Sequence, residues 1–209
     1  MILITGFEPF GGHTSNPSIA AAREAAQELS ASGIPAVAEE LPCVFAASPG
    51  ALLRAIERHR PDIVVCVGLA ATRRVLSLER VAINVIDARI PDNAGARPVD
   101  EPVEADGPAA YFTRLPIKRT LAALDSAGIG AEVSQTAGTF VCNQVFYSLM
   151  HQLKESGADL PAGFVHVPQP GEGDGVAPPA PDLARALAIV AREALNPSPD
   201  AILAAGAES

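Results

Sequence analysis

Several features that would assign a chain to a common protein class are missing from this sequence. Its three cysteines, Cys43, Cys66 and Cys142, are odd in number and lack CxxC spacing, which excludes a disulfide framework and a four-ligand zinc site. We therefore expect free thiols in a reducing cytoplasm. The longest apolar run, IVVCVGLAA, is too short to cross a bilayer, and the N-terminus has neither the basic region nor the cleavage site of a secretory signal.

Clustered basic charge is also missing. The chain has 15 Lys and Arg against 24 Asp and Glu, a formal net charge of −9, so we expect no nucleic-acid partner and no membrane partner. With 209 residues, of which 48% are hydrophobic and 19% charged, the chain can bury the core of one globular domain. We expect this domain to span residues 1–209, with residues 196–209 as a frayed tail.

Nucleotide-binding and serine-hydrolase motifs are absent as well. The GFEPFGG segment lies between a predicted strand and a predicted helix, but it lacks the spacing of a dinucleotide-binding loop and the GK[ST] of a Walker loop. No G-x-S-x-G elbow is present for a serine nucleophile. A tight turn or a substrate loop is therefore the favoured interpretation of GFEPFGG.

Strand-like and helix-like segments alternate along the chain. Asn16 before Pro17, and Ser48 before Pro49, have the pattern of a helix N-cap followed by a first helical proline. The alternation predicts a single-domain α/β fold with three layers, α/β/α, around a twisted and largely parallel central sheet. The predicted strands are residues 1–5, 35–45, 62–70, 76–90, 131–137 and 163–168, and the predicted helices are residues 17–33, 49–60, 117–128, 142–156 and 182–195.

Cys142 lies where an apolar segment changes into a helix with apolar residues at helical spacing. The first turn of a helix has unpaired N–H groups and a partial positive charge, which favour a thiolate and can hold an oxyanion. Buried cysteines are common, however, so the pattern alone favours a structural cysteine. Cys66, inside an apolar run, and Cys43, at a strand end, are interpreted as core residues.

A nucleophilic cysteine needs a base, and His166 in GFVHVP is the best placed of the four histidines. It lies near the end of the strand that follows the Cys142 helix, and strand carboxyl ends share one edge of a parallel sheet with helix N-termini. A hydrogen-bonded core histidine is the equal alternative. Glu79, a lone acid between apolar segments, is a candidate to orient His166, although the pattern alone favours an ion pair with Arg80 or Arg73.

Taken together, these segments resemble the pyroglutamyl peptidase type I family, also called pyrrolidone-carboxylate peptidases, which are cysteine peptidases. The resemblance implies hydrolysis of the amide bond after an N-terminal pyroglutamyl residue of a peptide, with no metal and no organic cofactor. It also implies a homo-oligomer, either a dimer or a tetramer. The similar segments run in order from Thr5 to Pro168: TGFEPFGG with NPS, PDIVVCVGLA, ERVAIN, DARIPDN, GPAAYFTRLPIK, TAGTFVCN and GFVHVP.

The resemblance also implies roles for individual residues. Cys142 becomes the nucleophile, His166 the base and acid, and Glu79 the group that orients His166. Arg89 resembles a family arginine close to the active site and is expected to assist the oxyanion. The residues implied to form the pyroglutamyl pocket are Phe7, Phe10, Asn16, Ile90, Phe140 and Val141.

Some positions depart from the family pattern. Gln144 stands where the family commonly has histidine, Ala71 and Thr72 stand where it often has glycines, and Gln169–Gly173 differs from the usual turn after the histidine strand. The effect of the last two departures on substrate contacts stays open. Two other interpretations also remain: a different α/β cysteine amidase that acts on a free amide, and a small-ligand binding protein in which Cys142 only packs.

Overall fold

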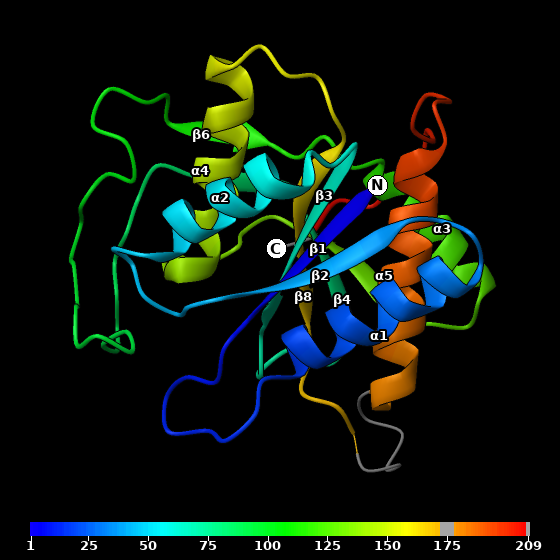
Figure 1. Ribbon diagram of the computed structural model, residues 1–209, viewed down its shortest axis with the longest axis horizontal. Coiled ribbons are helices and arrows are strands. Elements are labelled where there is room, and N and C mark those ends of the chain that lie inside the picture. The colour runs from blue at the N-terminus through cyan, green and yellow to red at the C-terminus, as the bar shows by residue number, and fades with distance from the viewer. Residues whose placement is uncertain (172–177, 208–209) are drawn as a thin grey trace.

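The computed structural model describes residues 1–171 and 178–207, which form a twisted sheet with helices on both faces (Figure 1). Residues 172–177 and 208–209, which include part of the Gln169–Gly173 segment and the end of the predicted tail, lie outside the described residues. Within the described ranges, no helix is both long enough and apolar enough to cross a membrane. The helices are α1 (Pro17–Ala31), α2 (Ser48–His59), α3 (Ile117–Ser126), α4 (Val141–Glu155) and α5 (Ala180–Leu195).

The main sheet contains six strands in the order β2-β1-β3-β8-β4-β7. Neighbouring strands are parallel except at the β4–β8 border, where Ser77 pairs with His166 and Leu78 with Val165 in antiparallel register. The prediction of a largely parallel sheet is therefore confirmed. The strands are β1 (Ile2–Phe7), β2 (Ala36–Leu41), β3 (Ile63–Leu69), β4 (Leu76–Glu79), β5 (Val81–Ile83), β6 (Ala110–Phe112), β7 (Ala131–Ser134) and β8 (Ala162–Val167).

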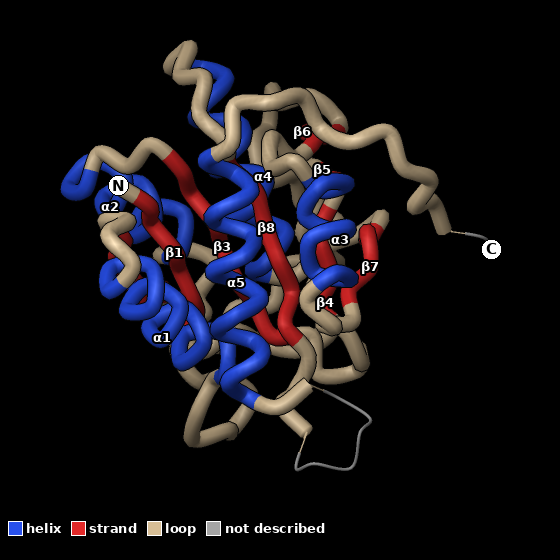
Figure 2. The backbone as a smooth tube through the Cα atoms, turned by 90° about the vertical axis from the view of Figure 1, so that its right-hand side faces the viewer, coloured by secondary structure: helices blue, strands red, loops and turns tan. Residues whose placement is uncertain are grey.

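Two separate cores cover the two faces of the sheet, as the predicted three layers require. Along β3, Ile63, Val65 and Val67 pack in one core with α1, α3 and α5, which lie together in front of the strands in Figure 2. Val64 and Cys66 point the other way and pack in the second core with α2 and α4. This alternation explains why the β3 sequence is apolar at nearly every position, because both faces of the strand are buried.

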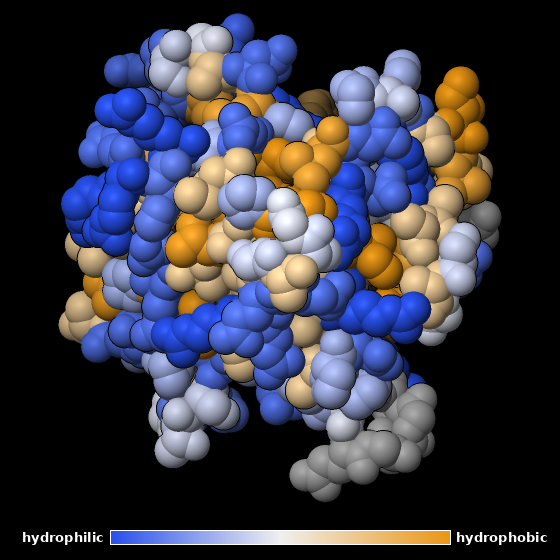
Figure 3. Space-filling model, turned by 45° about the vertical axis from the view of Figure 1, so that its right-hand side comes forward, coloured by the Kyte–Doolittle hydropathy of each residue, from blue (hydrophilic) through white to orange (hydrophobic). Residues whose placement is uncertain are grey.

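The outer surface is mixed, with polar residues beside apolar patches on the face seen in Figure 3. Most of the large apolar side chains of the described residues are buried in the two cores. The most exposed apolar ones lie in the β5–β6 region and in the C-terminal segment. The large apolar side chains with substantial exposure are Met1, Ile90, Val99, Phe112, Leu195, Ile202 and Leu203.

The predicted N-cap of the second helix is wrong. Ala47 occupies the N-cap of α2, and Ser48 is the first helical residue, followed by Pro49. The Ser48 hydroxyl contacts the carbonyl oxygen of Pro42 and accepts a hydrogen bond from the Val44 N–H at 3.3 Å. It therefore closes the turn before the helix, so it makes no capping bond to the helical N–H groups.

The predicted strand 76–90 is also wrong as a single element. β4 ends at Glu79, and β5 pairs antiparallel with β6, a strand that the sequence did not predict, in a separate two-stranded sheet. The buried Asn143 of α4 explains the departure: its Oδ1 accepts from the Ile83 N–H at 3.0 Å, and its Nδ2 donates to the carbonyls of Ile83 and Val85 at 2.9 and 3.0 Å. These bonds tie the segment after β4 to α4, away from the main sheet.

Residues 196–200, part of the predicted frayed tail, are hydrogen-bonded to α3. The Asp200 carboxylate accepts from the backbone N–H groups of Lys118 and Arg119, at 3.1 and 2.8 Å, in the first turn of α3. This carboxylate satisfies the helix N-terminus, whose N-cap residue makes no side-chain bond. The Arg119 side chain pairs with the Glu193 carboxylate at 2.8 Å and also donates to the carbonyls of Glu193, Asn196, Ser198 and Pro199.

Cys66 is fully buried, as predicted, and this burial raises the pKa of its thiol from 9.0 to about 12. A pKa that is higher in the folded than in the unfolded chain stabilises the folded state fully below the unfolded value and progressively less above it. We predict that the free energy of unfolding falls between pH 9.0 and about 12, by up to about 1.4 kcal/mol per pH unit from this thiol. Urea unfolding across this pH range measures the decline.

The Cys66→Ala variant is the control for this alkaline window, because it lacks the thiol. We expect it to be about 1–3 kcal/mol less stable than the parent at neutral pH, since it leaves a small cavity. Its stability should nevertheless fall less steeply at alkaline pH. Equal slopes in the two proteins would contradict the prediction.

Candidate active site

Cys142 lies in the first turn of α4, as predicted, and it is partly exposed. The N-cap residue, Phe140, has no side-chain acceptor, so the first-turn N–H groups lack a capping partner. The first backbone bond of the helix runs from the Gln144 N–H to the Phe140 carbonyl at 3.2 Å. The thiol therefore lies among uncapped backbone donors at the positive end of a helix.

Cys142 and His166 line one cavity of about 190 Å³. Gly68 of β3 lies between them: it pairs with His166 across the β3–β8 ladder, and a Cβ built on it would lie 2.7 Å from the Cys142 Sγ. The thiol thus packs directly on the β3 backbone beside the histidine, which the sequence could only suggest. The other residues that line the cavity are Phe7, Phe10, Asn16, Cys43, Leu69, Ala137 and Phe140.

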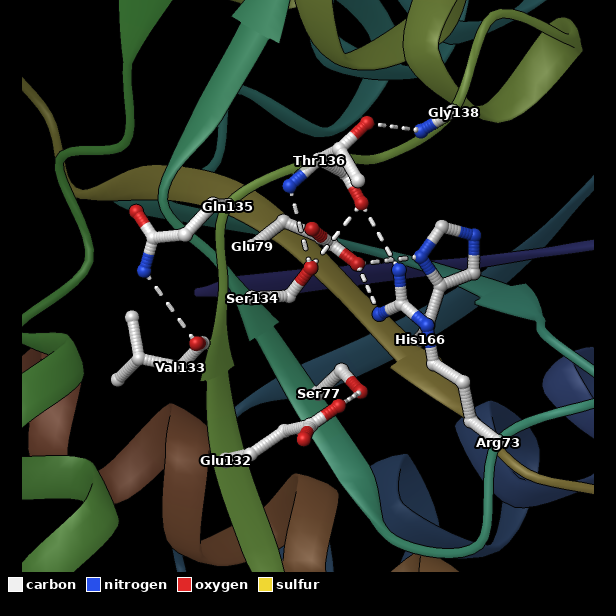
Figure 4. A network of polar contacts seen from close by, with 10 residues as sticks. All are labelled: Arg73, Ser77, Glu79, Glu132, Val133, Ser134, Gln135, Thr136, Gly138 and His166. Carbon is white, nitrogen blue, oxygen red and sulfur yellow. Dashed lines mark hydrogen bonds and ion pairs between the residues drawn. The ribbon is translucent and has the colours of Figure 1, made fainter. Parts of the chain in front are cut away.

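His166 is held by a buried carboxylate. Its Nδ1 lies 2.7 Å from Oε1 of Glu79, a residue with no exposed surface (Figure 4). A carboxylate accepts the proton of Nδ1, so Nε2 is left free to accept a proton from another group. The ring also packs against Phe164, with a centroid distance of 4.9 Å. Both predicted partners of Glu79 are present, because Arg73 Nη1 contacts the same Oε1 at 2.5 Å.

Two opposing effects act on the protonation of Cys142. Burial raises the pKa of the Cys142 thiol above its ordinary value, and the neighbouring thiol of Cys43 and the charge of Glu79 act in the same direction. The positive charge of Arg73 acts in the opposite direction but is outweighed. Burial thus works against the thiolate that the helix terminus favours, which makes a base that removes the proton important.

Asn16 caps a helix and also lines the cavity. Its Oδ1 accepts from the Ser18 N–H at 3.0 Å, which confirms the predicted N-cap of α1, and from the Ser18 hydroxyl at 2.8 Å. Its Nδ2 donates to the Glu8 carbonyl at 3.0 Å. The same buried side chain lines the cavity with Cys142 and His166.

The other predicted pocket residues fall into three groups. Phe7, Phe10 and Phe140 line the cavity with the thiol, and the rings of Phe10 and Phe140 lie 6.3 Å apart. Val141 is instead fully buried in the core beneath the cavity. Arg89 and Ile90 are exposed and line a separate groove of about 470 Å³, which shares Phe140 with the cavity and also contacts Asp87, Gly138 and Thr139.

Three cavity residues were not predicted: Cys43, Leu69 and Ala137. Leu69 is the last residue of β3, and Cys43 follows the end of β2, so both lie at the sheet edge where β1, β3 and β8 also end. Strand ends at the carboxyl edge were the available signal for these two. Ala137 lies in the irregular segment between β7 and α4, for which the sequence gave no equivalent signal.

Of the other three histidines, His13 does not line the cavity but packs against Phe10, with ring centroids 6.5 Å apart, and the other two lie elsewhere. His59 Nε2 pairs with Glu39 at 2.6 Å, and His151 Nδ1 with the Tyr111 hydroxyl at 2.9 Å. Within residues 1–171 and 178–207, no three His, Cys, Asp or Glu side chains are grouped so that they could hold a metal ion. A larger hollow of about 720 Å³ lies beside α3, but its lining residues include Asp125 and Ser126 without a histidine or a cysteine. The chemistry therefore concentrates at the Cys142 cavity.

A thiol, an imidazole and a buried carboxylate at the edge of an α/β sheet are the arrangement of a cysteine hydrolase. Comparison with known proteins narrows this class. Residues 1–178 match the family model described as pyroglutamyl peptidase. The chain belongs to this family.

Similar proteins and solved structures agree with this assignment. The chain is 54% identical over 182 residues to the pyrrolidone-carboxylate peptidase of Streptomyces coelicolor, covering 86% of this chain and 84% of that one. It is 50% identical over 167 residues to that of Bacillus licheniformis, covering 80% and 77%. The crystal structure of Bacillus amyloliquefaciens pyroglutamyl peptidase I matches with a TM-score of 0.84 at 44% identity, covering 92% of this chain and 95% of that one.

We predict that Gly68→Ala slows the alkylation of Cys142 by iodoacetamide, because the added Cβ would lie 2.7 Å from Sγ and 2.9 Å from Cζ of Phe164. Overpacking of this kind costs about 1–3 kcal/mol and displaces the thiol from His166. Mass spectrometry of time-resolved alkylation measures the rate, and urea unfolding measures the stability.

Gly50→Ala is the matched control, because its Cβ would meet only the flexible end of Arg54, at 3.2 Å, within α2. Alanine is the better helix former, so this variant should keep both the stability and the alkylation rate of the parent. Unchanged alkylation of Cys142 in Gly68→Ala would show that the thiol does not depend on this close contact.

Proposed function

We propose that this pyroglutamyl peptidase uses Cys142, His166 and Glu79 as a catalytic triad to hydrolyse the amide bond after an N-terminal pyroglutamyl residue. The observation that carries the proposal is the cavity itself: it joins the thiol and the Glu79-bound imidazole to an apolar, phenylalanine-lined space. A family assignment alone gives the reaction class. The cavity supplies the nucleophile, the base and the recognition surface in one place.

The two chemical steps follow from a Cys142 thiol that lies beside an imidazole whose Nδ1 is bonded to the Glu79 carboxylate. Nε2 of His166 removes the Cys142 proton as Sγ attacks the pyroglutamyl carbonyl carbon, and the resulting imidazolium then protonates the leaving amine as the C–N bond breaks. Glu79 stabilises this imidazolium through Nδ1. In the second step His166 takes a proton from water, the hydroxyl attacks the thioester, and the proton returns to Sγ as free pyroglutamate leaves.

The developing oxyanion needs donors close to Sγ. The uncapped N–H groups in the first turn of α4, including that of Cys142, are the proposed donors, because they lie at the nucleophile and make no capping bond. Arg89 lines the groove next to Phe140 and not the cavity. Its proposed contribution is therefore a positive charge near the site.

Selectivity for pyroglutamate follows from desolvation. The lactam ring is uncharged and has one N–H and one C=O, so an apolar cavity accepts it once these two groups are hydrogen-bonded. Asn16 keeps one amide hydrogen beyond its bond to Glu8 and is the proposed donor to the lactam carbonyl. Among the described residues, no carboxylate lines the cavity, so an ordinary N-terminal ammonium would be buried without a partner, at a cost of several kcal/mol.

The two alternative functions are less well supported. A general cysteine amidase would need polar groups for a free amide, whereas Asn16 alone among the described lining residues outside the triad has a side-chain amide or hydroxyl. A binding protein without chemistry would not need a buried Glu79 bonded to His166 beside a cysteine. The family match also favours the peptidase over both.

The setting and the assembly are further parts of the proposal. A cytoplasmic location suits three free thiols, since a reducing compartment keeps Cys142 reactive. A homo-oligomer, either a dimer or a tetramer, would cover apolar side chains such as Phe112, which is 69% exposed, and Val99, which is 60% exposed. Light scattering of the purified chain tests the assembly, and a monomer at micromolar concentration would refute it.

We predict that the reduced protein cleaves a pyroglutamyl fluorogenic amide and that Cys142→Ala abolishes this cleavage while unfolding at a similar urea concentration. The variant removes only a sulfur atom, so it should keep the fold and the substrate affinity. Release of the fluorophore measures activity, and far-ultraviolet circular dichroism during urea unfolding measures stability. Intact substrate after incubation with the wild-type protein would refute the proposed function.

Substrate analogues test the basis of selectivity. A prolyl amide has a similar ring but carries an ammonium and lacks the lactam carbonyl, and a glutaminyl amide carries a free ammonium on an open chain. We predict a kcat/KM at least about 10³-fold lower for both, because desolvation of the ammonium costs several kcal/mol and no new interaction offsets it. Comparable rates for the prolyl and pyroglutamyl amides would contradict a cavity that selects against charge.

A further inference from the structure

Two donors meet at one oxygen of Glu79, the Nδ1–H of His166 and the guanidinium of Arg73. Nδ1 of His166 and Nη1 of Arg73 lie 2.7 and 2.5 Å from Oε1, whereas Oε2 is buried and has no hydrogen-bond partner among the described residues (Figure 4). Glu79 has no exposed surface, so water does not solvate its charge. The carboxylate that orients the histidine therefore depends on the guanidinium of Arg73 for its charge compensation.

Arg73 has a second contact that leads toward the nucleophile. Its Nη2 donates to the Thr136 carbonyl at 2.8 Å. Thr136 is itself fixed, because the same carbonyl accepts from the Ser134 hydroxyl at 3.0 Å and its own Oγ1 accepts from the Gly138 N–H at 3.0 Å. Thr136 precedes the first turn of α4 by only a few residues. One planar guanidinium thus bridges the end of β4 and the segment that carries Cys142 (Figure 4).

We propose that Arg73 is a fourth member of the catalytic arrangement, a positioning residue that keeps Glu79 ionised and aimed at His166 and ties both to the segment before Cys142. The proposal rests on the proposed function. Arg73 does not line the substrate cavity, so its effect would pass through Glu79 without contact to the substrate. The alternative is an ordinary ion pair that stabilises the fold without affecting the reaction.

The titratable groups that interact with Glu79 fix the sign of the expected pH effect. They are Arg73 from the segment before β4, His166 from β8 and the thiol of Cys142 from α4, whereas Glu132 of β7 accepts from the Ser77 hydroxyl at 2.8 Å. Among these, Arg73 supplies the permanent positive charge. Without it, buried Glu79 would take up a proton at a higher pH, and His166 would retain its proton to a higher pH. Both changes move the acid limb of kcat/KM toward higher pH.

The test is the kcat/KM profile of Arg73→Met. We expect kcat to fall by about 10- to 100-fold, as for other residues that orient a catalytic group, with KM nearly unchanged and the acid limb shifted to higher pH. Arg73→Lys should restore much of the pH profile, because it keeps the charge. It should restore kcat only partly, because an ammonium cannot bridge Glu79 and Thr136 as a planar fork does.

Arg119→Met is the matched control. Arg119 also pairs with a carboxylate and donates to several backbone carbonyls, but it holds the C-terminal segment on α3 and does not line the cavity. This variant should lose stability and keep the kcat and pH profile of the parent. If Arg73→Met behaves in the same way, with unchanged kcat and an unchanged acid limb, the positioning role is refuted.

A double-mutant cycle with Glu79→Gln keeps the proposal testable if Arg73→Met folds poorly. Because Arg73 acts through Glu79, a change at Arg73 should matter little once Glu79 is neutral. Arg73→Lys should therefore lower kcat much less in the Glu79→Gln protein than in the parent. Additive losses would overturn the proposal. Alkylation of Cys142 by iodoacetamide serves as a readout without substrate: slower alkylation in Arg73→Met supports the role, and unchanged alkylation opposes it, even if the wild type proved inactive on pyroglutamyl amides.

Discussion

The bond between the Glu79 carboxylate and Nδ1 of His166 is the interaction on which the rest of the site depends. It fixes which imidazole nitrogen carries a proton and which is free to accept one. Because the carboxylate is buried, that bond is strong only while its charge is compensated, and the neighbouring guanidinium supplies the compensation. The imidazole and the guanidinium therefore both bind the same oxygen, Oε1 of Glu79.

The fold explains how this oxygen reaches the histidine. β4 runs antiparallel to β8, with Ser77 opposite His166, so Glu79 lies two residues further along the same face of the sheet as a diagonal neighbour of the histidine. The register across this antiparallel border thus places Glu79 beside His166.

Much of this arrangement could be predicted from the sequence, and the parts that could not have identifiable physical reasons. Helical spacing and strand alternation predicted the three layers, and the N-cap pattern of Asn16 predicted the start of α1. The end of the predicted strand 76–90 at Glu79 could not be predicted. It depends on hydrogen bonds from Asn143 of α4 to Ile83, sixty residues away along the chain. Long-range side-chain to backbone bonds of this kind have no local signature.

The site shows the same division. The family resemblance singled out Cys142, His166 and Glu79, and the three phenylalanines that line the cavity. It did not separate Arg89 and Ile90, which lie in the neighbouring groove, from the cavity itself, since adjacency along the chain says nothing about which hollow a side chain enters. The helix terminus alone did not reveal that burial raises the pKa of the Cys142 thiol, because the degree of burial depends on residues from several elements.

In the proposed function, the burial that favours the substrate also determines what the proposed triad must do. Among the described residues no carboxylate lines this apolar cavity, so an ammonium would be disfavoured, but the same lack of water raises the pKa of the Cys142 thiol and opposes the effect of the helix N-terminus. A nucleophile in such a cavity has its thiolate form disfavoured by burial. The nucleophile needs a base, His166, whose Nδ1 is held by the negative charge of Glu79. Because Glu79 is buried as well, its charge must be compensated by a cation, Arg73. Selectivity for an uncharged ring and the chain of charges behind His166 are therefore two consequences of one desolvated site.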